Sequence, residues 1–190
     1  KFLTNDKKKY IAKYYIEQSL DFNAIKSETR NLIYLNNLGL EFFPSIVSDD
    51  KKFIIISFIE NNGVQPHETR KDLLRAITTL HSIKNNHYGF GFETQIGGLR
   101  QKNSLSDNWV DFYRDYRLGY IFEIINSNNP MGNMINKQIE TLLKNLENFI
   151  PNNPEASLLH GDLWEGNILF NNYDFVGFEN YVWAVTDAEM

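Results

Sequence analysis

The chain has 190 residues, of which 42% are hydrophobic and 23% charged, and its formal net charge at pH 7 is -5. This composition is typical of a folded globular protein and excludes a collagen, a wholly disordered chain and a disulfide-stapled miniprotein. The chain has no cysteine, which excludes disulfides, thiolate catalysis and cysteine-ligated metal centres. The acidic balance argues against a nucleic-acid partner, and no apolar run has the length of a membrane span. We therefore expect a cytoplasmic protein that binds neither nucleic acid nor a membrane.

The first sixty residues predict a small lobe of mixed secondary structure. A hairpin is predicted over 1–16. Its first strand contains Phe2 and Leu3, a polar turn follows, and its second strand is the aromatic and β-branched run over 10–16. Residues 21–38 predict a helix that begins at an Asp21 N-cap and stops at Gly39. Residues 44–47 and 53–59 predict two further strands. The expected order is strand, strand, helix, strand, strand.

The rest of the chain is predicted to be mostly helical. Residues 61–63, Asn-Asn-Gly, predict a hinge that separates a lobe over 1–60 from a second lobe over 64–190. Apolar spacing predicts helices over 68–80, 109–125 and 134–149. We also expect a short strand over 157–159 and a final hairpin between 168–170 and 181–185.

The segment over 159–169, Leu-His-Gly-Asp-Leu-Trp-Glu-Gly-Asn-Ile-Leu, holds the clearest chemical signal. It places Asp162 and Asn167 five residues apart on a loop between two short apolar strands. In phosphoryl transfer a carboxylate orients the acceptor hydroxyl and takes its proton, while an amide oxygen holds a magnesium ion at the phosphates. Gly161 and Gly166 permit the tight turns that such a loop needs. The spacing predicts a kinase with Asp162 as its catalytic base.

A kinase also needs groups upstream of this loop that bind the nucleotide. Lys13 lies on a predicted strand and Glu28 in the middle of the following predicted helix, so the two are expected to pair and anchor the phosphates. The expected hinge contacts adenine through backbone groups of three consecutive residues, Phe58, Ile59 and Glu60.

A second magnesium ligand is expected after the catalytic loop, and two aspartates are candidates. Asp187 follows the predicted strand over 181–185, whereas Asp174 lies in a polar turn. We favour Asp187, so that Asn167 and Asp187 form the predicted metal site.

The octapeptide His-Gly-Asp-Leu-Trp-Glu-Gly-Asn at 160–167 is similar to the catalytic loop of the fructosamine kinases, also called ketosamine 3-kinases. Trp164 separates this family from aminoglycoside and choline kinases, which share the aspartate and the asparagine. Lys13 and Glu28 match its phosphate-anchoring pair. The region over 89–118 resembles its substrate-lobe pattern in order and spacing, through Gly89-Phe90-Gly91-Phe92, Ile96-Gly97-Gly98, Gln101, Asn103, Trp109, Phe112, Tyr113, Arg117 and Leu118.

The resemblance implies an α+β fold of the protein-kinase-like type, with a nucleotide-binding sheet-and-helix lobe and a mostly helical substrate and catalytic lobe. It implies ATP and Mg²⁺ as cofactors and a small-molecule or protein-bound ketosamine as substrate. Phosphorylation of the sugar 3-hydroxyl makes the adduct unstable, which frees the amine and deglycates the protein. Trp164 would offer an apolar face to the sugar, and His160 is expected to order the loop beside the substrate. The oligomeric state stays open.

The chain also departs from the family pattern. No glycine precedes Lys13, although the family has a glycine-bearing hairpin there, and Asp187-Ala188 lacks the family's following proline. The sequence therefore looks truncated at both ends relative to the family. Two alternatives stay open: a related phosphotransferase of the aminoglycoside or choline type, and a catalytically impaired pseudokinase that serves as a binding module.

Overall fold

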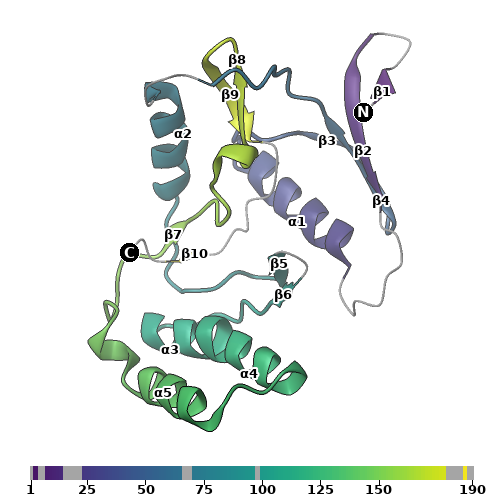
Figure 1. Cartoon of the computed structure of the whole chain (residues 1–190). Helices are drawn as coiled ribbons and strands as arrows, with labels where there is room; N and C mark the ends of the chain where they lie inside the picture. The colour runs from purple at the N-terminus through teal and green to yellow at the C-terminus, as the bar shows by residue number, and fades with distance from the viewer. Residues whose placement is uncertain are drawn as a thin grey trace. The chain divides into compact units, whose positions relative to one another are not determined.

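Figure 1 shows the computed structural model of the chain, which describes residues 2–3, 7–14, 23–65, 70–96, 99–178 and 186–187. The chain divides into two compact units. The first comprises residues 1–82, 94–100 and 159–184, and the second comprises residues 83–93, 101–158 and 185–190. Both contain helices and antiparallel strands, which confirms the α+β prediction. No helix within the described ranges is long and apolar enough to cross a membrane.

A four-stranded antiparallel sheet is the first feature of the first unit. It consists of β1 (Phe2–Leu3), β2 (Lys9–Tyr14), β3 (Ile46–Asp49) and β4 (Phe53–Ser57), in the order β1-β2-β4-β3. The predicted hairpin and the two later strands are therefore confirmed. Along β4, Ile54 and Ile56 are buried while Phe53 is exposed, because successive side chains of a strand point to opposite faces. The helix α1 (Ala24–Asn37) packs against β3 and β4 (Figure 1).

The helix α1 begins later than the sequence indicated. Its N-cap is Asn23, whose side-chain oxygen accepts a hydrogen bond from the backbone N–H of Lys26 at 3.0 Å. The prediction of Asp21 as the cap was wrong, and Asp21 itself lies outside the described residues. Asn and Asp cap equally well, so only the backbone path decides between two such residues placed so close together. The helix ends just before Gly39, as predicted.

The C-terminal part of the first unit contains a hairpin that the sequence did not predict. The strand β8 (Ile168–Asn171) pairs with β9 (Asp174–Phe178), and the second strand that was predicted, over 181–185, lies outside the described residues. The two residues between the strands, Asn172 and Tyr173, have φ of 48° and 72°. Two left-handed residues in succession match the right-handed twist of the strands and close a hairpin in the shortest way. The sequence did not predict the β8–β9 hairpin because Tyr173 carries no sign of a turn.

A helix and a small hairpin also belong to the first unit. The helix α2 (Lys71–His81) follows the predicted hinge and packs against β9. The strands β5 (Thr94–Ile96) and β6 (Leu99–Gln101) form a small hairpin, and β5 contacts α1. The predicted hinge over 61–63 contacts β8, because the backbone N–H groups of Asn62 and Gly63 both donate to the carbonyl of Phe170, at 3.1 and 3.2 Å.

The second unit is built from helices around an aromatic core. α3 (Trp109–Tyr113), a π-helical turn (Arg114–Leu118) and α4 (Gly119–Asn128) form one continuous helix where the sequence predicted one. α5 (Asn133–Lys144) follows, and a 3-10 turn continues it over Leu146–Asn148. β7 (Ser157–Leu158) pairs with β10 (Thr186–Asp187). The core cluster consists of Tyr88, Trp109, Phe112 and Ala156.

Candidate active site

The loop over 159–167 brings its predicted catalytic pair together. The side-chain N–H₂ of Asn167 donates to both the main-chain oxygen and the carboxylate oxygen Oδ2 of Asp162, each at 2.8 Å. Gly161 makes this possible, because its φ of 76° lies in the left-handed region that a β-carbon disfavours. The asparagine is 6% exposed, so its amide holds the partly buried carboxylate of Asp162 in a fixed place.

The ring of His160 lies beneath this loop. It is 3% exposed and packs against the rings of Phe43 and Phe178, with centroid separations of 6.2 and 4.8 Å, and those two rings also contact one another at 5.3 Å. Its Nδ1 accepts a hydrogen bond from the backbone N–H of Asp162 at 3.4 Å. This position favours a role in ordering the loop over the predicted contact with substrate, because a side chain that is 3% exposed offers almost no surface to a ligand.

The strand β2 and the helix α1 bring Lys13 and Glu28 into contact. The Nζ of Lys13 donates to Oε1 of Glu28 at 2.6 Å. Glu28 is almost fully buried, with 3% of its side chain exposed, whereas 24% of the Lys13 side chain is exposed. A buried carboxylate needs a cation or several donors beside it, and Lys13 supplies the cation. An ammonium has three N–H donors, so this ion pair still permits the same group to bind a phosphate.

The predicted metal ligands differ in how far the structure describes them. Asn167 uses its side-chain nitrogen for Asp162, which leaves its amide oxygen as the hard donor that Mg²⁺ prefers. The backbone of Asp187 lies in β10 of the second unit, opposite Ser157. Asp174 is bound through Oδ1 to the guanidinium of Arg70 at 2.7 Å, an arrangement that neutralises its charge. Within the described ranges no three His, Asp or Glu side chains gather as a metal site.

The predicted hinge residues lie at the end of β4. The backbone N–H of Phe58 donates to the carbonyl of Lys9 at 3.2 Å, and the Lys9 ammonium pairs with the carboxylate of Glu60. Ile59 packs so closely on Gly177 of β9 that a β-carbon there would stand 2.8 Å from its Cδ1. Residues 58–60 are thus held by β2 on one side and by the β8–β9 hairpin on the other.

Three motif residues of the region over 89–118, Asn103, Phe112 and Arg117, contact one another in the second unit. Arg117 is 8% exposed and donates to Oδ1 of Asn103 and to the carbonyl of Lys102, each at 2.9 Å. Its guanidinium also lies 4.6 Å from the ring centroid of Phe112. Asn103 in turn donates to the carbonyl of Phe92. These contacts make this part of the motif structural.

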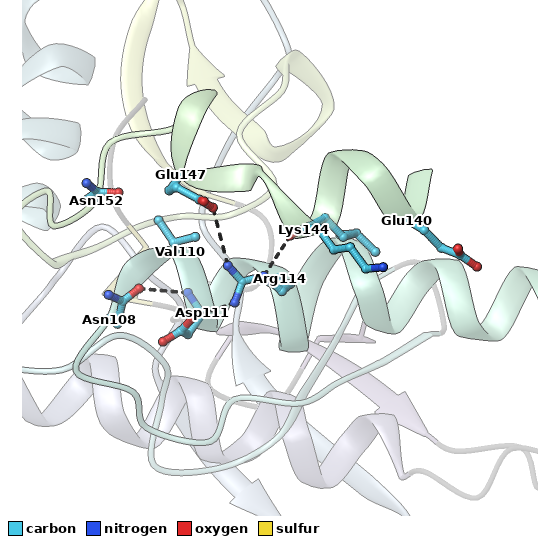
Figure 2. Close-up of a pocket in the computed structure, with 9 residues that line it drawn as sticks. Asn108, Val110, Asp111, Arg114, Glu140, Lys144, Glu147 and Asn152 are labelled. Carbon is cyan, nitrogen blue, oxygen red and sulfur yellow. Dashed lines mark hydrogen bonds and ion pairs between the residues drawn. The ribbon is translucent and has the colours of Figure 1, made fainter. Parts of the chain in front are cut away.

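A cavity of about 650 Å³ opens between α3 and α5, and none of the predicted site residues lines it. Figure 2 shows Arg114 at its centre. The guanidinium of Arg114 pairs with the carboxylates of Asp111 at 2.6 Å and Glu147 at 3.9 Å, and it donates to the carbonyl of Leu143 at 2.9 Å (Figure 2). These contacts join the two helices.

The fold and the site together define a class of protein. The protein-kinase-like phosphotransferase fold has two such features. One is a lysine on a strand that pairs with a glutamate on a helix, and the other is a loop that joins an aspartate to an asparagine. A solved structure described as a fructosamine-3-kinase of Thermobifida fusca has this fold, with a TM-score of 0.77 and 19% identity over 96% of this chain and 63% of its own. The ternary complex of APH(2″)-IIa with streptomycin and ATP has it too, with a TM-score of 0.65 and 20% identity over 97% of this chain and 62% of its own.

The chain belongs to the fructosamine kinase family, whose model matches residues 2–183, and the predicted resemblance is confirmed. The chain is 34% identical over 123 residues to the chloroplastic protein-ribulosamine 3-kinase of Arabidopsis thaliana, which covers 63% of the chain and 36% of that relative. It is 24% identical over 168 residues to a probable ketoamine kinase of Vibrio vulnificus, which covers 85% of the chain and 57% of that relative. The chain thus spans only part of the length of these relatives.

Proposed function

We propose that this protein is an ATP-dependent kinase that phosphorylates a sugar hydroxyl of ketosamine adducts and so supports protein deglycation. The observation that carries the proposal is the pair of hydrogen bonds that ties Asn167 to Asp162, because it places a proton acceptor beside a metal-binding amide oxygen. Family membership supports the same chemistry. The names of the relatives, a ribulosamine 3-kinase and a ketoamine kinase, support a sugar–amine adduct as the substrate class.

In the proposed reaction the carboxylate of Asp162 accepts a hydrogen bond from the 3-hydroxyl of the sugar. As the hydroxyl oxygen bonds to the γ-phosphorus of ATP, its proton passes to Asp162 and the bond to the ADP oxygen breaks. Trp164, which is 57% exposed, offers its indole to the adduct. His160 keeps the loop in shape from beneath.

The nucleotide is assigned to the groups of the first lobe. Lys13, oriented by Glu28, binds the phosphates, and the backbone of the three hinge residues over 58–60 contacts the adenine. Asn167 and Asp187 hold Mg²⁺, which neutralises charge on the phosphates when it is bound. On this proposal residues 1–60 form the nucleotide-binding lobe, 61–63 the hinge and 64–190 the substrate and catalytic lobe. The complex of APH(2″)-IIa with ATP supports ATP as the donor, since it has the same fold.

The test is turnover of magnesium-ATP with and without fructosyl-lysine by the wild type and by Asp162→Asn. We expect turnover that depends on fructosyl-lysine, and a loss of at least about a hundredfold in kcat for Asp162→Asn, because a general base contributes roughly that factor. ATP affinity, measured by calorimetry, should stay within about twofold, since Asp162 is assigned to the acceptor hydroxyl.

The matched control is Asp50→Asn, which makes the same change of carboxylate to amide at an exposed position in the turn after β3. It should leave kcat unchanged. Full turnover by Asp162→Asn would contradict the base assignment. A folded wild type that binds ATP but turns over nothing would support the pseudokinase alternative.

A further inference from the structure

The indole of Trp164 lies directly on the backbone of Gly166. A β-carbon added to Gly166 would stand 2.4 Å from Cζ2 and from Cη2 of the indole, and 2.8 Å from Cζ3. Non-bonded carbon atoms normally approach to about 3.5–4.0 Å. The ring can therefore occupy this place only because residue 166 has no side chain.

The local backbone explains why the ring meets a residue two positions further along the chain. Trp164 is extended, with φ of -138° and ψ of 167°, and a 3-10 turn over Glu165–Asn167 follows it at once. The backbone N–H of Asn167 closes that turn by donating to the carbonyl of Trp164 at 2.9 Å. Because Asn167 is also bound to Asp162, the seat of the indole is fixed to the proposed catalytic pair.

The seated ring is still largely open to solvent. The side chain of Trp164 is 57% exposed and that of its neighbour Leu163 is 42% exposed, whereas His160 and Asn167 of the same loop are buried. One face of the indole is taken by the backbone of Gly166, so a ligand can stack on the opposite face alone. An indole with a rigid backing provides a large contact area for the C–H face of a sugar and attracts a protonated amine.

We propose that Gly166 is a positioning residue that seats the Trp164 indole as a one-sided platform for the ketosamine substrate. The inference rests on the proposed function for the identity of the ligand, but the seating of the ring is independent of it. Any side chain at position 166 displaces the indole. The loop keeps its fold, because the largely exposed ring can move into the solvent.

The seating is tested by ¹⁹F NMR of protein labelled with 5-fluorotryptophan, which has three tryptophan signals. Trp164→Phe identifies the Trp164 signal by its loss. In Gly166→Ala that signal should move, while the signal of Trp109, which is 1% exposed in the core of the second unit, stays in place and reports an intact fold. Gly91→Ala is the matched control, since a β-carbon there meets no atom within 4 Å. An unmoved Trp164 signal in Gly166→Ala would overturn the proposal.

The role in substrate binding is tested by kinetics of the same variants. Gly166→Ala should raise the KM for fructosyl-lysine about tenfold, the effect of losing one aromatic contact of about 1.4 kcal/mol, with the KM for ATP unchanged. In a Trp164→Ala background the same change should have no further effect. A shifted Trp164 signal together with an unchanged KM for fructosyl-lysine would overturn the proposed role of the indole as a substrate platform. Absence of any fructosyl-lysine turnover by the wild type would instead contradict the proposed function, and the NMR result would still decide the seating.

Discussion

Asn31 is a polar side chain that is fully buried in the first unit. It lies on α1, three residues after Glu28, and none of its surface is exposed. Within the part of the chain that the structure describes, neither atom of its side-chain amide has a hydrogen-bond partner. An unpaired buried amide destabilises a fold by about 1–3 kcal/mol. The hydroxyl groups of Ser27 and Thr29 on the same helix are also buried, and they have no hydrogen-bond partner among the residues that the structure describes.

We expect Asn31→Leu to raise the free energy of unfolding by about 1 kcal/mol, because leucine has a similar branched shape and no polar group to desolvate. Urea denaturation followed by circular dichroism measures it. The matched control is Asn36→Leu on the same helix. Asn36 donates to the carbonyl of Pro44 and accepts from the N–H of Ile46, so its loss should destabilise. A lower midpoint for Asn31→Leu would show that this amide has a partner in the native protein.

At the scale of elements, the β8–β9 hairpin shows how a turn is made without the usual residues. Asn172 suits its left-handed conformation, but Tyr173, with φ of 72°, does not. The hairpin is held by Asn62 instead. The side-chain amide of Asn62 donates to Oδ1 of Asn172 at 2.8 Å, and its oxygen accepts from the backbone N–H of Asn172 at 3.1 Å. Tertiary contacts therefore stabilise a turn that local preference opposes.

We expect Tyr173→Gly to stabilise the protein by up to about 1 kcal/mol, because a left-handed residue with a β-carbon is strained by roughly that amount and glycine is not. The midpoint of urea unfolding measures the change. Tyr173→Ala removes the same half-exposed ring and keeps the β-carbon, so it should give no gain. Equal effects of the two variants would mean that the lost ring, and not backbone strain, decides the result.

At the scale of the whole molecule, one carboxylate connects segments that are 103 residues apart. Asp72, at the start of α2, accepts a hydrogen bond from the backbone N–H of Phe175 in β9. It also accepts from Arg70, whose guanidinium binds Asp174 of the same hairpin. Burial raises the pKa of Asp72. The hydrogen bonds from Arg70 and from backbone N–H groups lower it by more, so that the pKa lies below its ordinary value of 3.8.

A lowered pKa in the folded state means that ionised Asp72 stabilises the fold above pH 3.8 and that this contribution is lost as the pH falls through the folded pKa. Asp72→Asn should therefore flatten the fall of stability below pH 3.8, measured as the thermal midpoint against pH. The effect should be modest, because the side chain is 36% exposed. Asp50→Asn controls for the loss of one charge. An unchanged pH profile for Asp72→Asn would exclude this linkage.

The sequence by itself determined the features that depend on local spacing. The spacing of five positions from Asp162 to Asn167 and the period of the helices and strands are properties of short segments, and the strand, strand, helix, strand, strand order of the first sixty residues is as predicted. The motif at 160–167 was also enough to indicate the family. The structure alone showed which side chains and strands meet. It showed that Arg70 binds Asp174, 104 residues further along the chain, because packing brings these segments together. It also showed that β8 pairs with β9 and that the indole of Trp164 rests on Gly166. The last two contacts are local, but they depend on backbone angles at Asn172, Tyr173 and Trp164 that the spacing of residue types does not give.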